Sequence, residues 1–198
     1  MIEVKIVDYN SFKDCIRISN GSIELIVTTQ VGPRIIRFGF IGGDNLLFED
    51  TDGQIFHDLA RFQKFDDDKW NIYGGHRLWA SPEIMPRTYY PDNEPVEYTI
   101  TKNGAILKAK SQVYTQLQNE IEITMHEGKD TVDISHRIKN NNAWAVTFAP
   151  WALTVMAPGG KEFIPLPDED TNYLPNRFIS LWKYTSLRDE RLYLGEKY

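Results

Sequence analysis

The segment 71–83 holds the densest group of chemically useful side chains in this sequence. His76 can donate or accept a proton near neutral pH, and Arg77 can bind two anionic oxygens with its planar guanidinium. Trp79 offers an aromatic face, and Glu83 adds a carboxylate after a proline that ends regular strand pairing. The two glycines before His76 lack the Cβ atoms that would keep the backbone away from a ligand or a neighbouring strand. The segment therefore predicts one wall of a polar cleft, with His76 and Glu83 as candidate catalytic acid and base.

A purely structural interpretation of the same segment stays open. The paired glycines can simply begin a strand whose Trp79 packs in the core, because aromatic side chains are mostly buried. Arg77 and Glu83 can form a surface ion pair, and His76 can bond a backbone carbonyl. Residue types alone do not separate the two interpretations, since short motifs predict function loosely.

Three further residues join Arg77 and Trp79 as predicted substrate-binding residues. Arg34 follows a Gly-Pro break and can reach the same cleft, although an exposed charge at the rim explains it equally well. Tyr73 directly precedes the glycine pair. Trp151 can stack on a sugar ring or pack in the core.

Other polar residues are interpreted as structural. His136 shares the apolar face of its predicted strand, which favours a core histidine over a ligand. The acidic run at residues 66–68 could bind a hard cation, but its spacing does not match a calcium loop, so a solvated turn is favoured. We therefore predict no metal and no cofactor. Cys15 is the single cysteine, which excludes an internal disulfide and favours a reducing compartment.

Length and composition limit the classes of function. A chain of 198 residues with 41% hydrophobic and 25% charged residues fits one globular domain, predicted over residues 1–198. A net charge of −6 argues against nucleic acid as a partner, because phosphate binding needs a basic surface. No apolar stretch is long enough to span a bilayer, so no membrane partner is expected. The first residues lack a basic region followed by an apolar one, and we predict a cytoplasmic protein.

Alternation of apolar and polar residues dominates the sequence and predicts an all-β protein. The runs at this period of two lie near residues 2–6, 16–18, 23–28, 36–40, 96–110, 121–125, 132–138 and 144–155. Turn signals separate these runs, and many short strands of this kind favour an antiparallel β-sandwich. Weaker signals predict short strands at 46–48, 178–183 and 192–194.

Several local features of this pattern predict specific structures. Asn20 and Gly21 predict a hairpin with a type I′ turn, which needs positive φ at both central positions. The pattern fails over residues 49–70, where a long loop is expected, with one or two helical turns within 55–65. The apolar face switches at Pro150, which predicts a β-bulge.

Four short segments resemble the galactose mutarotase-like superfamily. Residues 32–36 (Gly-Pro-Arg-Ile-Ile) and 43–48 (Gly-Asp-Asn-Leu-Leu-Phe) resemble its opening strand pair. Residues 73–79 (Tyr-Gly-Gly-His-Arg-Leu-Trp) are similar to the Gly-Gly segment that enters its sugar cleft, in an uncharacterised branch of that superfamily. Residues 137–140 resemble its strand that ends in Asn. The resemblance extends from residue 23 to about residue 160 and implies a β-supersandwich whose concave face binds carbohydrate.

The sequence departs from the aldose 1-epimerases of that superfamily at the catalytic positions. Those enzymes open and close a sugar hemiacetal with a histidine acid and a glutamate base. Trp151 stands where one imidazole is expected, and the family's late glutamate is either absent or lies beyond Tyr198. In the second case the fold would be incomplete at its C-terminus. The resemblance thus implies either an epimerase-like isomerase that uses His76 and Glu83, or a sugar-binding module without catalysis. A third interpretation is an assembly protein that forms a homo-oligomer through its aromatic face.

Overall fold

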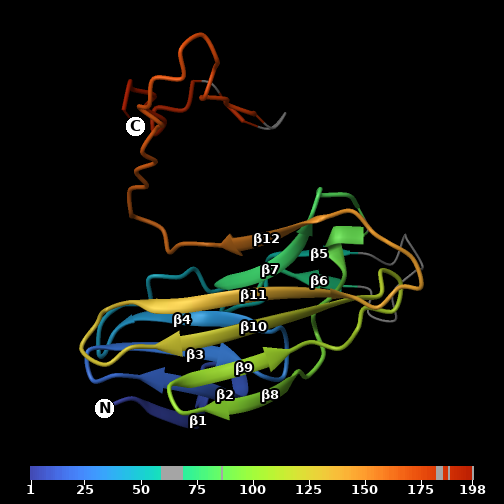
Figure 1. Cartoon of the computed structure of the whole chain (residues 1–198). Coiled ribbons are helices and arrows are strands. Elements are labelled where there is room, and N and C mark those ends of the chain that lie inside the picture. The colour runs from blue at the N-terminus through green and yellow to red at the C-terminus, as the bar shows by residue number, and fades with distance from the viewer. Residues whose placement is uncertain (59–68, 86, 182–184, 187, 198) are drawn as a thin grey trace. The chain divides into compact units, whose positions relative to one another are not determined.

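The computed structural model of this protein describes residues 1–58, 69–85, 87–181, 185–186 and 188–197. The chain divides into two units, Met1–Pro158 and Gly159–Tyr198, and each is described by itself. The elements are β1 (Glu3–Tyr9), β2 (Phe12–Ser19), β3 (Ile23–Thr28), β4 (Arg34–Phe40), β5 (Phe56–Asp58), β6 (Lys69–Asn71), β7 (His76–Ser81), the 3₁₀-helix η2 (Arg87–Tyr89), β8 (Glu97–Thr101), β9 (Gly104–Lys108), β10 (Leu117–Met125), β11 (Val132–Asn140) and β12 (Ala149–Thr154). All of them belong to the first unit (Figure 1).

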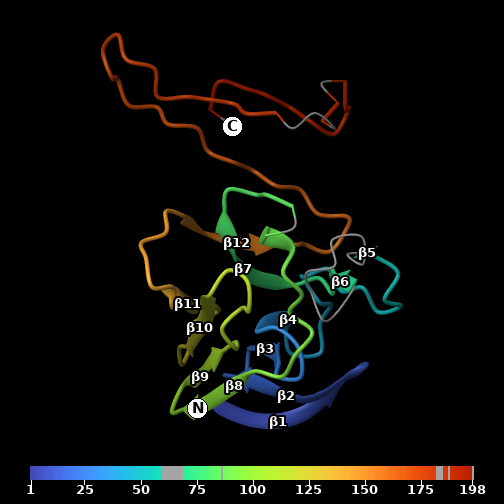
Figure 2. The same ribbon diagram turned by 90° about the vertical axis from the view of Figure 1, so that its right-hand side faces the viewer.

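Two antiparallel sheets make up most of the first unit and confirm the predicted all-β sandwich (Figures 1 and 2). One sheet has the strand order β1-β2-β3-β4-β7-β12, and the other has the order β11-β10-β9-β8. A separate pair, β5 and β6, forms from residues on both sides of the segment 59–68. Strands β12 and β11 are edge strands, which matters for the site described below.

The core lies between the two sheets, as the alternation of apolar residues requires. Its buried side chains come from both layers and are Ile16, Ile18, Ile23, Leu25, Val27, Ile35, Leu47, Leu78, Val96, Ala105, Leu107, Ile121, Ile123 and Met125. Full burial of one such Ile or Leu side chain stabilises the fold by about 1.5–3 kcal/mol. A smaller cluster of Cys15, Ile26 and Ile36 packs on the other face of the first sheet.

The glycine pair before β7 is required by a neighbouring backbone. Gly74 and Gly75 both have positive φ, +102° and +68°. A Cβ at Gly75 would overlap the carbonyl oxygen of Ile35, and one at Gly74 would overlap that of Phe48. Ile35 is also the residue through which β4 pairs with β7, at His76. The glycines therefore allow β7 to join the sheet, and they fix the position of the residues that follow.

Pro150 and the residues before it differ from the prediction. Residues 144–148 form no strand, and Pro150 lies opposite Ala80 in the regular register of β12 and β7, so the predicted bulge is wrong. A proline is tolerated there because β12 is an edge strand with one unpaired side. The irregularities instead fall between Val7 and Tyr9 and between Ile26 and Val27.

Three other local predictions need correction or lie partly outside the described residues. Only Gly21 of the Asn20–Gly21 turn has positive φ, so the turn is not type I′; the Asn20 side chain accepts hydrogen bonds from the amides of Ser22 and Ile23 instead. The helical turns predicted within 55–65 are replaced at 56–58 by β5, and the rest of that segment lies outside the described residues. Residue Leu47 forms a single β-bridge, to Met156, in place of a strand at 46–48.

The second unit, Gly159–Tyr198, contains no helix or strand among its described residues. The strands predicted at 178–183 and 192–194 are therefore wrong where the structure describes them, and residues 182 and 183 lie outside the described part. Large apolar side chains of this unit, including Phe163 and Phe178, are exposed, so they contribute no core that would hold strands together. The Arg177 side chain instead donates to the carbonyls of Pro167 and Glu196.

In the part of the chain that the structure describes, no helix is long and apolar enough to cross a membrane.

Candidate binding cleft in the first unit

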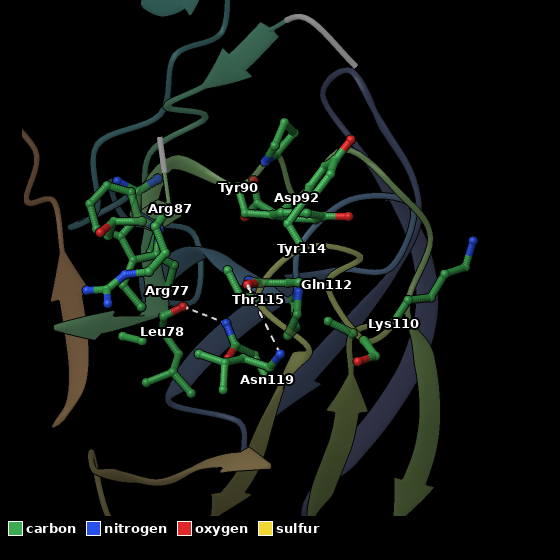
Figure 3. Close-up of a pocket in the computed structure, with 18 of the residues that line it drawn as sticks. Arg77, Leu78, Arg87, Tyr90, Asp92, Lys110, Gln112, Tyr114, Thr115 and Asn119 are labelled. Carbon is green, nitrogen blue, oxygen red and sulfur yellow. Dashed lines mark hydrogen bonds between the residues drawn. The ribbon is translucent and has the colours of Figure 1, made fainter. Parts of the chain in front are cut away.

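A cleft with a volume of about 430 Å³ opens beside β7 in the first unit. Its walls come from five parts of the chain: residues 32–33, β7 at residues 77–80, the segment 87–96, residues 109–119 of the β9–β10 connection and the start of β10, and the segment 142–148 after β11. Figure 3 shows ten of the lining side chains by name. This volume lies within the range of small-molecule sites in proteins, about 300–1,000 Å³.

Amide side chains hold these segments together. Asn119 of β10 donates from Nδ2 to the carbonyl of Leu78 at 3.0 Å, which joins the two sheets at the cleft (Figure 3). Asn142 donates from Nδ2 to the carbonyl of Thr115 at 2.8 Å and so fastens the segment 142–148 to the connection between β9 and β10. These bonds explain why residues 144–148 leave the sheet and line the cleft.

Exposed aromatic rings and hydrogen-bonding side chains share the cleft wall. Trp144 is 69% exposed and Tyr114 is 54% exposed, although both are large and mostly apolar. Gln112 and Asn119 add amide groups to the same wall, and the Gln112 Oε1 atom accepts a short hydrogen bond from the Thr115 hydroxyl. Figure 3 shows Tyr114, Gln112 and Thr115 together at the centre of the view. Flat apolar rings next to amides and hydroxyls can contact both the C–H and the O–H groups of one small molecule.

Arg77 lies in the cleft wall within a group of aromatic rings. Its guanidinium carbon is 4.6 Å from the ring centroid of Trp70 and 3.9 Å from that of Trp79. The ring of Trp79 in turn lies 5.2 Å from that of Tyr89 and 5.7 Å from that of Trp151. Burial, together with the nearby positive charge of Arg34, lowers the pKa of Arg77 to about 9. Arg77 and Trp79 both line the cleft, as the sequence predicted for one wall, and their binding role stays a prediction.

Arg34 lies behind the cleft as a buried structural cation. It is 1% exposed and donates from Nη1 to the carbonyls of Ile72 and Gly74, at 2.8 and 3.0 Å. Its Nη2 forms an ion pair with Asp92 Oδ2 at 2.6 Å. Tyr73 stacks near this guanidinium, with its ring centroid 5.2 Å from the Arg34 Cζ atom. Neither Arg34 nor Tyr73 is among the cleft-lining residues, whereas Asp92 is.

The His76 imidazole faces the second sheet and contacts another histidine. Its Nε2 lies 2.8 Å from His136 Nε2 on β11, and its Nδ1 lies 2.7 Å from Thr154 Oγ1 on β12. Burial, together with the charges of His136 and Arg34, lowers the pKa of His76 to about 4. Burial also lowers the pKa of His136. Both imidazoles are therefore neutral at pH 7, and neither lines the cleft.

His76 and Glu83 are not brought together as an acid and base pair. The Glu83 carboxylate accepts a short hydrogen bond from the Tyr89 hydroxyl and is exposed. Along β7, the Cα atoms of His76 and Ser81 alone are separated by about 16 Å at the usual rise of a strand. Both ring nitrogens of His76 already contact Thr154 and His136, and neither His76 nor Glu83 lines the cleft.

The sequence reasoning missed several residues of the cleft. Trp144 was assigned to a strand, and Asp92, Tyr114 and Asn119 were not singled out. The side chain of Trp151 packs edge-on against Trp79, with ring centroids 5.7 Å apart, and is not among the lining residues. An Asn or Tyr in a short connection carries no signal by itself, because only the tertiary fold decides which connections meet.

Within the described residues, no group of three or more His, Cys, Asp or Glu side chains could hold a metal ion. The acidic run at 66–68 lies outside the described residues.

Comparison with protein-family models, with curated proteins and with solved structures finds no match for this chain. The resemblance to the galactose mutarotase-like superfamily therefore stays a prediction.

Proposed function

We propose that this protein binds a carbohydrate in the cleft beside β7. The observation that carries the proposal is that two exposed rings, Trp144 and Tyr114, line the same cleft as the amide side chains of Gln112 and Asn119. A sugar ring has an apolar C–H face and a rim of hydroxyls. Aromatic rings cover the C–H face, and amide groups form hydrogen bonds with the hydroxyls. Burying exposed apolar area contributes about 25 cal/mol per Å², so covering these rings favours binding.

The geometry supports binding more than catalysis. Among the described residues that line the cleft there is no imidazole, and its carboxylates already have cationic partners. Asp92 pairs with Arg34, and Glu94 Oε2 lies 3.3 Å from Lys110 Nζ. The proton transfers of an epimerase need an acid and a base positioned on the sugar. We therefore favour a sugar-binding module over an isomerase.

Ligand screening tests this proposal. The protein is added to a glycan array, and each sugar that binds is then titrated while tryptophan fluorescence is recorded. We expect saturable quenching with at least one sugar and no acceleration of anomer exchange in saturation-transfer NMR. Folded protein that binds no glycan would overturn the proposal, and rapid anomer exchange would replace a binding module with an enzyme.

Self-association is a second candidate, favoured by exposed apolar side chains away from the cleft. Phe40, Leu46 and Met156 are exposed, and backbone bonds bring their segments together: Leu46 donates to the carbonyl of Phe38, and Leu47 forms a β-bridge with Met156. Exposed apolar patches of this kind often mark protein interfaces. Sedimentation equilibrium of the wild-type protein and of the variant Phe40→Ser would show a dimer that the substitution weakens, and a wild-type monomer would exclude it.

The cytoplasm remains our proposed location. Cys15 is buried as a free thiol, and burial, with nearby carboxylates, raises its pKa to about 11. A buried thiol of this kind is compatible with a reducing compartment, and cell fractionation of the native protein would test the location.

A further inference from the structure

The Arg77 side chain is a buried cation without an anionic partner. It is 7% exposed, and it forms no hydrogen bond or ion pair with any residue that the structure describes. Its Nη1 atom is covered and unbonded. Leaving a buried charge unpaired is costly, so buried guanidinium groups in proteins are normally paired.

Arg34 shows how the same fold treats a structural buried arginine. Its two Nη atoms have two carbonyl acceptors and one carboxylate, all within 3.0 Å, and only its Nε is buried without a bond. The stacked rings of Trp70 and Trp79 hold the guanidinium of Arg77 in place but supply no acceptor for its N–H groups. Arg77 is thus oriented like a binding group and lacks only the anion.

Asp92 sets the charge balance of this wall of the cleft. Its Oδ2 is used by Arg34, whereas its Oδ1 is buried and unbonded. Asp92 and Arg77 both line the cleft, and the Asp92 charge acts on Arg77. Because Arg34 and Asp92 neutralise each other, one positive charge remains on the buried wall of the cleft.

The other charged groups of the cleft lie nearer its rim. Lys110 is balanced by Glu94, and Arg87 donates from Nη2 to the carbonyl of Pro82 at 2.6 Å. Figure 3 shows Arg87 and Arg77 on the same side of the view, with Lys110 on the other. The wall that carries Arg77 is therefore positive, although the whole chain carries a net charge of −6.

We propose that the ligand is a sugar that carries a carboxylate, with the carboxylate bound to the guanidinium of Arg77. This inference rests on the proposed carbohydrate binding and names its chemical class. A planar carboxylate matches the two-pronged guanidinium and brings a single negative charge, which balances Arg77, the unpaired cation of the buried wall. Arg87, the second cation on that side, is not buried and donates to the Pro82 carbonyl. A phosphate monoester carries nearly two negative charges and is tested as a separate arm.

The test compares pairs of sugars that differ only at C6. Glucuronate against glucose, and galacturonate against galactose, are titrated into the wild-type protein by calorimetry, with glucose 6-phosphate as the phosphate arm. We expect the uronate of at least one pair to bind about tenfold or more tightly than its hexose and more tightly than the phosphate. Equal affinity for hexose and uronate, or a preference for the phosphate, would overturn the inference while leaving carbohydrate binding intact. If the protein binds none of these sugars and no other glycan, that result would instead count against the proposed function.

Variants assign the preference to Arg77. In Arg77→Gln we expect the uronate preference to fall to within about twofold of the hexose, with hexose affinity largely kept. Lys102→Gln removes the same charge at an exposed position outside the cleft and should keep the preference. Should Arg77→Gln fail to fold, Arg77→Lys keeps the charge but loses the two-pronged geometry, and it should reduce the preference without abolishing it. An unchanged preference in a folded Arg77 variant would contradict the assignment.

Discussion

The Nε2 atoms of His76 and His136 lie 2.8 Å apart and join β7 of one sheet to β11 of the other. In such a bond one ring donates its N–H and the other accepts with a lone pair, so the bond is lost when both rings become imidazolium. Thr154 completes the group by contacting the other nitrogen of His76 at 2.7 Å. These three side chains link β7 and the edge strand β12 of one sheet to the edge strand β11 of the other, and they give the fold a pH dependence.

We predict that stability falls as the pH falls through this pair. The pKa of His76 is lowered to about 4 in the folded protein, below its usual value of about 6.5, so the unfolded chain binds more protons between these values. The stabilisation is complete above pH 6.5 and is lost as the pH falls toward 4. Allowing for solvent screening, we expect a loss on the order of 2 kcal/mol.

Urea unfolding at pH 7.5 and pH 4.5 measures this loss in the wild type and in His76→Gln. The substitution should reduce the difference between the two pH values by at least about 1 kcal/mol. His126→Gln is the control, because His126 bonds Asp133 outside this pair. An equal pH dependence in the wild type and His76→Gln would show that the pair does not control acid stability.

The substitution Gly75→Ala should destabilise the fold far more than a matched glycine substitution. Both Gly75 and Gly128 have nearly the same positive φ, +68° and +66°, but a Cβ at Gly128 meets nothing within 4 Å. Gly128→Ala should cost about 1 kcal/mol from backbone strain alone. Gly75→Ala adds the overlap with the Ile35 carbonyl, so we expect about 3 kcal/mol or more by chemical denaturation. Similar losses in the two variants would mean that β7 does not approach β4 so closely.

Replacing Arg34 with methionine should remove a buried ion pair and leave Asp92 without its cation. We expect a loss of about 3–5 kcal/mol in the free energy of unfolding. The control is Arg137→Met, since Arg137 is half-exposed and pairs with Glu120 and Glu122 on the surface. That substitution should cost about 1 kcal/mol or less. If both variants lose a similar amount, Arg34 is not the buried anchor of the cleft wall.

Trp144→Ala should weaken sugar binding and leave stability unchanged. The ring is exposed in the absence of ligand, so its removal should change the free energy of unfolding by about 0.5 kcal/mol or less. Loss of an aromatic contact in the complex should raise the Kd about tenfold. Tyr98→Ala removes an exposed ring of β8 outside the cleft and should change neither quantity. An unchanged Kd in Trp144→Ala would exclude Trp144 from the site.

The sandwich could be predicted from the sequence because its evidence is local. Alternating residues such as Ile16 and Ile18, or Ile121 and Ile123, face the core from strands whose turns are also marked in the sequence. The same alternation misassigned residues 144–148. An extended loop held by Asn142 shows the same period as a strand, and only hydrogen bonding to a neighbour distinguishes the two.

The site was less predictable because it depends on contacts between distant residues. Arg34 and Asp92 are 58 positions apart, and the His76 contact with His136 crosses from one sheet to the other. The glycine pair was recognised as a place of close approach, but sequence alone could not decide between a ligand and a strand. Arg77 was proposed as a binding residue because its planar guanidinium can bind two anionic oxygens; it does line the cleft, and its binding role stays a prediction.

Indole NMR tests the central claim, carbohydrate binding in this cleft, most directly. Each tryptophan of the ¹⁵N-labelled protein gives one indole N–H signal, and substitution of Trp144 and Trp79 assigns theirs. Addition of glucuronate, galacturonate, glucose or galactose should shift the Trp144 and Trp79 signals in a saturable way and affect the signal of buried Trp70 less. If a sugar binds and shifts only signals from tryptophans outside the cleft wall, or if no sugar shifts any of them, the cleft is not the carbohydrate site.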